Sequence, residues 1–390
     1  MRIIFLIALL NCILLSEENI SVKGHVGIEY ISYSNAQNDQ VVVSKNEFNY
    51  KKNDTSFLAK LDFFYSRNFK EKKDIYLNEL YVTHRSGDYD FKLGKMLIYW
   101  GALEGFNVTD VFNQKNVALD LFDKDEKKGS WSALLTKYND IGSVELGMKF
   151  YEPDNLYFDE ESPYYLLPVD YNHNLQVSHS PFSPTFHLKY TFTSESILES
   201  DTSIIIQHGY DNKRYFKLKS DDSLTQYAYK VNKILLSNTA IYEDYIFKFE
   251  GAYTDVIDDE SISDYGQVTL GLEKNFGDIG HFDTTLYVEY YRYLYMDENK
   301  IENIDLSEIY DNDIFLATRI VSNDVSSTEM KLGLLYDLKK NETLYKLEGK
   351  SKISDDFIAK LEVLHFSHSF ENYETLSDHT RVKLSMYYYF

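Results

Sequence analysis

The chain has 390 residues, with 62 acidic against 40 basic side chains and a net charge of −22. This charge excludes a nucleic-acid-binding function based on phosphate contacts, because such contacts need a basic surface. Tyrosine and phenylalanine number 35 and 25 whereas proline numbers only 5, a composition that favours long, uninterrupted β-strands.

The first element in chain order is an apolar amino-terminal segment, residues 1–16 (MRIIFLIALLNCILLS). Its apolar run is too short for a transmembrane helix of about 20 residues and has the length of a secretory signal. Ser16 is a small residue suited to the position before a cleavage site. Cys12 allows the alternative of a lipoprotein, although Asn11 stands where a small residue would be expected. We therefore predict a signal peptide over 1–16 and one mature domain over 17–390.

Beyond the signal segment, apolar and polar side chains alternate along the chain. Because successive side chains of a strand face opposite sides, each alternating stretch presents one apolar and one polar face. The stretch 20–30 (ISVKGHVGIEY) is the first example. We predict 18 strands, or 16 if the runs between 201 and 242 are misassigned. They lie near 19–34, 39–50, 54–67, 74–85, 88–99, 130–138, 143–151, 184–193, 201–210, 229–242, 245–255, 264–276, 282–294, 313–321, 326–337, 343–351, 356–367 and 378–390.

Long strands with one apolar face, in an exported chain, are typical of an all-β fold, the transmembrane antiparallel β-barrel of the bacterial outer membrane. A soluble β-sandwich or solenoid also alternates, but sandwich strands usually have only about 5–6 residues. An even strand number places both chain ends on the periplasmic side, together with the short turns. The long connections then fall outside the cell: 100–129, 152–183, 211–228, 256–263, 295–312 and 368–377.

One segment, residues 91–116 (FKLGKMLIYWGALEGFNVTDVFNQKN), departs from the strand pattern. Lys95 falls on the apolar face, which predicts a β-bulge near Gly94. The strand ends near Trp100, and a long connection follows. The start of this connection, 102–113, has the residues for a short turn of helix. We expect the connection to fold into the barrel and narrow it.

This segment resembles a group of Gram-negative outer-membrane porin-like proteins. The features that carry the resemblance are Gly94-Lys95 at the strand end, Trp100-Gly101, and Asn107-x-x-Asp110, preceded by a hairpin (NELYVTHRSGDYDFKLGK). Members of the group are thought to pass small or hydrophobic nutrients. The resemblance implies a pore constriction lined by Trp100, Glu104, Asn107, Asp110 and Asn113. The alternative is that these residues only anchor the loop to the wall through hydrogen bonds.

Charged side chains occupy the polar face of the predicted strands, and opposite charges recur two residues apart. A charge facing lipid costs about 2–4 kcal/mol at the bilayer midplane, so these side chains must face the lumen. There they either line a hydrated pore or stiffen the wall through cross-strand pairs. The predicted lumen charges are Lys60, Asp62, Asp90, Lys92, Glu145, Lys149, Lys248, Glu250, Glu329, Lys331, Lys346, Glu348, Lys360, Glu362, Arg381 and Lys383.

The acidic surplus lies mainly in three predicted extracellular segments, 152–161, 255–264 and 297–313. The simplest interpretation is a solvated rim around the mouth of the barrel. A second is loosely bound Ca²⁺ or Mg²⁺ shared with lipopolysaccharide, because clustered carboxylates suit hard cations. No other cofactor is expected.

The chain ends in VKLSMYYYF, so its final strand carries aromatic side chains to the last residue, Phe390. This resembles the terminal signature of Gram-negative outer-membrane proteins, which the barrel-assembly machinery reads. The expected partners are therefore outer-membrane lipid, lipopolysaccharide, that machinery and small solutes. The sequence is compatible with a monomer or an oligomer.

A search for catalytic groups gives no strong candidate. His365 and His368 would face opposite sides of a strand and could not bind one metal ion. A predicted loop contains two histidines near an aspartate and a serine, but a catalytic triad is defined by geometry. These residues are Asp170, His173, Ser178 and His179.

We predict a passive channel for small solutes in the bacterial outer membrane, without enzymatic activity. The lumen diameter, its charge and the connection 100–129 would filter the solutes. Two alternatives stay open. One is a non-conducting adhesin or receptor, and the other is an outer-membrane hydrolase.

Overall fold

The computed structural model of the chain describes residues 19–69, 72–120, 122–154, 157–158, 160–165, 167, 170–195, 198–220, 223–297, 299–300, 311–367 and 376–390. The predicted signal peptide with Cys12, part of the acidic segment 297–313, and His368 lie outside these ranges. Within the described ranges, no helix is both long and apolar enough to cross a membrane.

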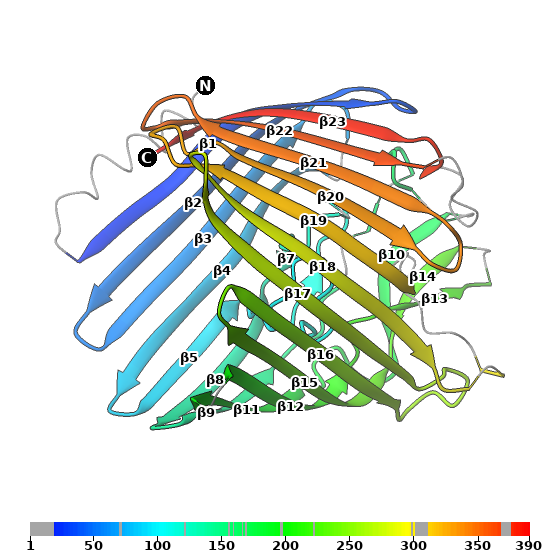
Figure 1. Cartoon of the computed structure of the whole chain (residues 1–390). Coiled ribbons are helices and arrows are strands. Elements are labelled where there is room, and N and C mark those ends of the chain that lie inside the picture. Colours follow the sequence, from blue (N-terminus) through cyan, green and yellow to red (C-terminus); the bar gives the residue numbers. More distant parts are fainter. Residues whose placement is uncertain are drawn as a thin grey trace.

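Eighteen strands form one closed antiparallel sheet (Figure 1). Each strand pairs with its neighbours in chain order, and the last strand pairs with the first, so the sheet has no free edge. The strands are β1 (Ile20–Tyr33), β2 (Asp39–Lys52), β3 (Thr55–Ser66), β4 (Lys73–Ser86), β5 (Tyr89–Met96), β8 (Ser130–Asn139), β9 (Gly142–Lys149), β11 (Thr185–Glu195), β12 (Glu199–Tyr210), β15 (Lys230–Tyr242), β16 (Tyr245–Val256), β17 (Tyr265–Ile279), β18 (Phe282–Tyr295), β19 (Asn312–Ser322), β20 (Glu329–Asp337), β21 (Thr343–Lys352), β22 (Phe357–Phe366) and β23 (Thr380–Tyr389). The predicted barrel and the higher of the two strand numbers are confirmed.

Alternation along the strands gives the barrel an apolar exterior and a polar interior. Ile28, Leu146 and Leu384 on the outer face are 64%, 53% and 51% exposed. Their neighbours Glu145 and Lys383 on the other face are ion-paired instead. The structure places all the predicted lumen charges on this inner face, at positions alternating with outward apolar side chains.

The two ends of the barrel differ in the length of their connections. One end, which we call the short-turn end, holds both described termini and tight turns such as the one at Gly87, where φ is 56°. The other, the long-loop end, carries the long connections. It also holds a small mixed sheet of β10 (Tyr171–Val177), β14 (Leu224–Ala228) and β13 (Tyr215–Leu218). In this sheet β14 pairs parallel with β10 and antiparallel with β13. The sequence did not predict this small sheet, because its strands are too short for alternation to identify.

The bulge predicted near Gly94 is wrong. Pairing is continuous through Gly94 and Lys95 on both sides of β5. The irregularity lies in β4, where Glu79 pairs with Lys60 and Leu77 with Leu61, leaving Asn78 between them. Lys95 remains on the outer face, and its Nζ donates to the backbone oxygen of Leu77 at 2.6 Å. The Leu77 carbonyl next to the β4 irregularity thus accepts a hydrogen bond from Lys95, and this side chain stays on the outer face without a bulge in β5.

Candidate functional site: the loop inside the barrel

The connection between β5 and β8, residues 97–129, lies inside the ring of strands, as Figure 1 shows for its β7 segment. We call it the inward loop. It contains two short antiparallel strands of two residues each, β6 (Gln114–Lys115) and β7 (Lys127–Lys128). The turn of helix expected over 102–113 is absent, and this stretch is irregular chain with isolated turns. The predicted inward folding of the connection is therefore present, without the predicted local structure.

Two buried wall carboxylates hold the inward loop by its backbone. Glu250 of β16 accepts hydrogen bonds from the amides of Ala102 and Thr109 at 2.8 and 3.0 Å. Glu289 of β18 accepts from three consecutive amides, those of residues 104 to 106, at 2.6, 2.8 and 3.3 Å. Charge-assisted hydrogen bonds of this kind are the strong ones. They fix one side of the loop against β16–β18.

A glycine makes the contact with Glu250 feasible. Gly101 has φ of 102°, a conformation that L side chains rarely adopt. A Cβ at this position would lie 2.6 Å from Glu250 Oε1 and 2.7 Å from Asn107 Oδ1. The Trp-Gly pair in the sequence therefore marks the point where the chain leaves the wall and turns into the lumen.

Four of the five predicted constriction residues hold the inward loop in place. Trp100 is only 4% exposed and packs edge-on against Phe112. Asn107 bonds both the amide and the carbonyl of Leu103. Asp110 forms an ion pair with Lys127. Asn113 accepts from the amide of residue 98 and donates to the carbonyls of residues 96 and 128. These contacts fit the anchoring alternative.

Glu104 behaves differently from the other four. Its side chain is 34% exposed and lies 3.5 Å from Lys331 on β20 and 4.0 Å from Lys124. The charges of Lys124 and Lys331 outweigh the effect of burial and hold the pKa of Glu104 below its usual value. It is therefore an ionised group at the open side of the loop.

Acidic side chains on the open side of the inward loop contact basic side chains of the wall. Asp120 lies 3.1 Å from Arg381 and 3.7 Å from Lys383, both on β23. Glu126 lies 2.9 Å from Lys45 on β2. Burial raises the pKa of Asp120, but the two β23 bases together bring it below the usual value. Burial raises the pKa of Glu126, and Lys45 only partly offsets this.

Two adjoining cavities lie between this acidic side and the wall. The first, of about 500 Å³, is lined by residues of the loop and of β1, β2 and β20–β23, including Asp120, Lys350 and Lys360. The second, of about 340 Å³, continues past Glu104 towards β18–β21. Both are lined by Lys331. The open space of the lumen thus follows the side of the barrel opposite to the Glu250 attachment.

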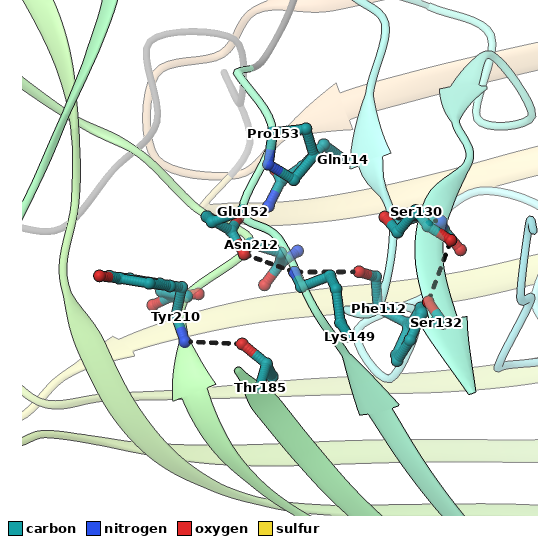
Figure 2. A network of polar contacts seen from close by, with 12 residues as sticks. Phe112, Gln114, Ser130, Ser132, Lys149, Glu152, Pro153, Thr185, Tyr210 and Asn212 are labelled. Atoms are coloured by element: carbon teal, nitrogen blue, oxygen red, sulfur yellow. Dashed lines mark hydrogen bonds and ion pairs between the residues drawn. The ribbon is translucent and has the colours of Figure 1, made fainter. Parts of the chain in front are cut away.

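A buried polar network ties the inward loop to the neighbouring long loops (Figure 2). Glu152 lies 2.7 Å from Lys149 Nζ, is ion-paired with Arg214, and accepts from Gln114 Nε2 at 2.8 Å. Lys149 also reaches the carbonyl of Phe112 at 3.5 Å. Glu152 was expected in a solvated acidic rim, but it is 1% exposed. The rim interpretation is wrong for this residue, because Glu152 is buried against two bases outside the acidic segment, Lys149 and Arg214.

The serine–histidine arrangement considered in the sequence does not form a triad. His179 Nδ1 lies 3.2 Å from Ser178 Oγ and 3.4 Å from Asp258 Oδ2. A triad needs the two imidazole nitrogens to contact different partners. Here both contacts use the same nitrogen, so the imidazole cannot pass a proton between them. Asp170 lies apart, its backbone oxygen bound to the amide of Leu224.

No protein-family profile and no curated protein matches this sequence. Among solved structures, OccD3 (OpdP) of Pseudomonas aeruginosa is similar with a TM-score of 0.56 and 12% identity over 96% of this chain and 91% of that one. OccK3 (OpdO) of the same organism has a TM-score of 0.54 and 10% identity over 98% of each chain. OpdK, solved with vanillate, has a TM-score of 0.54 and 11% identity over 96% of this chain and 99% of that one. At such identities the similarity establishes the fold, that of an outer-membrane β-barrel.

Proposed function

We propose that the chain is a passive outer-membrane channel for small polar solutes, with its long-loop end outside the cell. The observation that carries the proposal is the pair of adjoining cavities between the inward loop and the barrel wall, of about 500 and 340 Å³. Their surfaces carry charged groups of both signs, which favour a water-filled path.

The position of the inward loop supports selection of solutes where they pass beside it. The loop is fixed to β16–β18 by Glu250 and Glu289, while Asp120 and Glu126 contact bases on β23 and β2. It therefore crosses the lumen, and a solute has to pass beside it. Opposite charges on the two sides of this passage create a field across the path, which orients a dipolar solute.

The solute class is proposed from the charge pattern and from one similar barrel. The bases near the passage are matched by nearby carboxylates, as in the pairs Lys346–Glu348 and Lys350–Glu329. Such balance favours zwitterionic and polar solutes over highly charged ones. OpdK was solved with vanillate, an organic carboxylate, so we include organic carboxylates among the candidates.

A liposome-swelling assay with the purified protein tests this proposal. We expect liposomes that contain the protein to swell in small sugars, amino acids and organic carboxylates, and to resist swelling in large oligosaccharides. The matched control is the same lipid without protein. Swelling at the rate of the control in every small solute would contradict the channel and favour a non-conducting receptor or adhesin.

Assembly and catalysis complete the proposal. The last strand closes the barrel on β1, and Phe390 exchanges two backbone hydrogen bonds with Gly24 at 3.0 and 3.1 Å. We propose that this terminal strand is the segment that the barrel-assembly machinery reads.

The contacts at His179 support no hydrolase mechanism, so we propose a channel without catalytic activity.

A further inference from the structure

Three buried aspartates meet at the long-loop end of the barrel. Asp313 of β19 lies directly opposite Asp337 of β20 in the strand register, and Asp311 lies just before β19. One carboxylate oxygen of each lies within 4.8 Å of the other two. The three residues are only 5% (Asp311), 0% (Asp313) and 4% (Asp337) exposed.

Residues of the turn that follows β20 provide hydrogen bonds to some of the carboxylate oxygens of this cluster. Asp337 Oδ1 accepts from the amides of Lys339 and Lys340, both at 2.7 Å. Asp311 Oδ2 lies 3.2 Å from Lys339 Nζ. These contacts hold two of the aspartates in position but use only one oxygen of each.

The other four carboxylate oxygens have no hydrogen-bond partner among the described residues. They are Asp311 Oδ1, both oxygens of Asp313, and Asp337 Oδ2. Three other buried acids have donors: Glu250 and Glu289 accept from backbone amides, and Asp211 lies 2.6 Å from Lys233. The aspartate cluster therefore lacks the compensation that these three acids receive.

Physical chemistry leaves few ways to stabilise such a group. Three carboxylates at this separation repel one another, and burial removes the water that would screen them. A hard divalent cation supplies the missing charge and takes oxygen ligands. Oxygens bound to one Ca²⁺ at about 2.3–2.6 Å can lie up to about 5 Å apart, which matches the spacing here.

We propose that Asp311, Asp313 and Asp337 bind one Ca²⁺ ion. The ion ties the start of β19 to the turn that begins at Asp337. This site differs from the loosely bound ions expected at the acidic loops, because its ligands are buried and two of them, Asp313 and Asp337, lie opposite each other on paired strands.

Direct binding by the full-length protein in detergent tests the site. After EDTA treatment and its removal, the protein is titrated with Ca²⁺ in a calorimeter, and separately with Tb³⁺ while tyrosine is excited. Tyr291 lies opposite Asp313 in the register, and the Tyr293 amide bonds the Asp311 carbonyl at 2.8 Å. We expect one Ca²⁺ per chain, and tyrosine-sensitised Tb³⁺ emission that Ca²⁺ displaces.

The decisive comparison uses Asp313→Asn with Glu260→Gln as its matched control. Glu260 is an exposed acid in the segment 255–264, so its replacement removes the same charge without touching the cluster. We expect Asp313→Asn to weaken Ca²⁺ binding at least ~100-fold, since even indirect partners of a metal ligand contribute 10–100-fold. Glu260→Gln should bind as the wild type does.

Thermal unfolding provides an independent readout. Ca²⁺ should raise the unfolding temperature of the wild type and leave that of Asp313→Asn unchanged. Asp337→Asn is the second variant if Asp313→Asn does not fold. Absence of Ca²⁺ binding by the wild type, or equal binding by a cluster variant and Glu260→Gln, would overturn the proposal.

Discussion

At the scale of single residues, the wall carboxylates decide where the inward loop lies. Glu250 and Glu289 are 1% and 2% exposed, and each compensates its buried charge with several hydrogen bonds from the loop. If the loop left, both carboxylates would lose these partners inside the lumen. Attachment of the loop and ionisation of the wall are therefore coupled.

Replacing Glu289 by glutamine should loosen this attachment. Glutamine keeps the shape but loses the charge and one acceptor, which costs about 1–3 kcal/mol of hydrogen bonding. We expect frequent current fluctuations in single-channel recordings of Glu289→Gln. Glu273→Gln is the matched control, because Glu273 pairs with Lys248 on the wall and accepts no hydrogen bond from the described amides of the loop. Equally quiet currents in both variants would argue against this anchoring role.

The acidic side of the loop gives a pH dependence with a definite sign. Burial raises the pKa of Glu126, and burial together with Asp123 raises that of Asp125. Both groups therefore take up protons at a higher pH than an ordinary carboxyl, whose pKa is about 4. We expect a weak cation preference at neutral pH that declines on acidification, beginning at a higher pH than for an ordinary carboxyl group.

Reversal potentials in a salt gradient measure this preference. Glu126→Gln should start with a smaller cation preference and lose less of it on acidification. Glu260→Gln, at the exposed mouth, should keep the pH dependence of the wild type. A preference for anions at neutral pH, or a preference that strengthens on acidification, would refute this assignment of charge.

At the scale of elements, the strands could be predicted from sequence and the path of the inward loop could not. Alternation such as that of residues 20–30 depends only on neighbouring positions, so it can be recognised locally. The contacts of the loop join residues far apart, such as Ala102 with Glu250 and Asp120 with Arg381. Nothing in the local pattern specifies such partners. Glu289 was missed for this reason.

The five predicted constriction residues illustrate the same limit. Their identities marked an unusual segment, but not which side chains point into the open lumen. Asn113 and Glu104 are both polar, yet the first is 2% exposed and bonded on all sides while the second lines a cavity. Likewise, the sequence placed Asp313 in an acidic segment, but it did not indicate that Asp337 of the next strand lies opposite it.

Deleting residues 102–126 tests the inward loop as an element. These residues lie in the lumen between β16–β18 and β23, and none of them belongs to a strand of the barrel wall. We expect a severalfold higher single-channel conductance and faster swelling in larger sugars. Heat-modifiable migration on gels should verify that the barrel has folded. A folded deletion variant with wild-type conductance would show that the loop does not limit the passage.

Phe390 offers a second test at this scale. Its side chain is 37% exposed on the outer face, and its backbone supplies the bonds to Gly24. We expect Phe390→Ala to refold normally in detergent but to accumulate poorly in the outer membrane of cells. Phe357→Ala, an equally outward aromatic at 40% exposure, serves as the control. Equal accumulation of the two variants would remove the assembly role from Phe390.

At the scale of the whole molecule, the barrel separates two environments and one loop divides the lumen. The apolar side chains face outward, whereas Glu250, Lys383 and the other lumen charges face inward. The inward loop contacts the wall on both sides, at Glu250 and Glu289 and again through Asp120 and Glu126, and two adjoining cavities lie along the second side. We propose that these cavities form part of a charged, narrow water path through the barrel.

Single-channel current through the purified full-length protein in a planar bilayer measures this path most directly. We predict discrete, voltage-independent steps of ion current whose size grows in proportion to salt concentration. A protein that inserts as a folded barrel but carries no current would contradict the account.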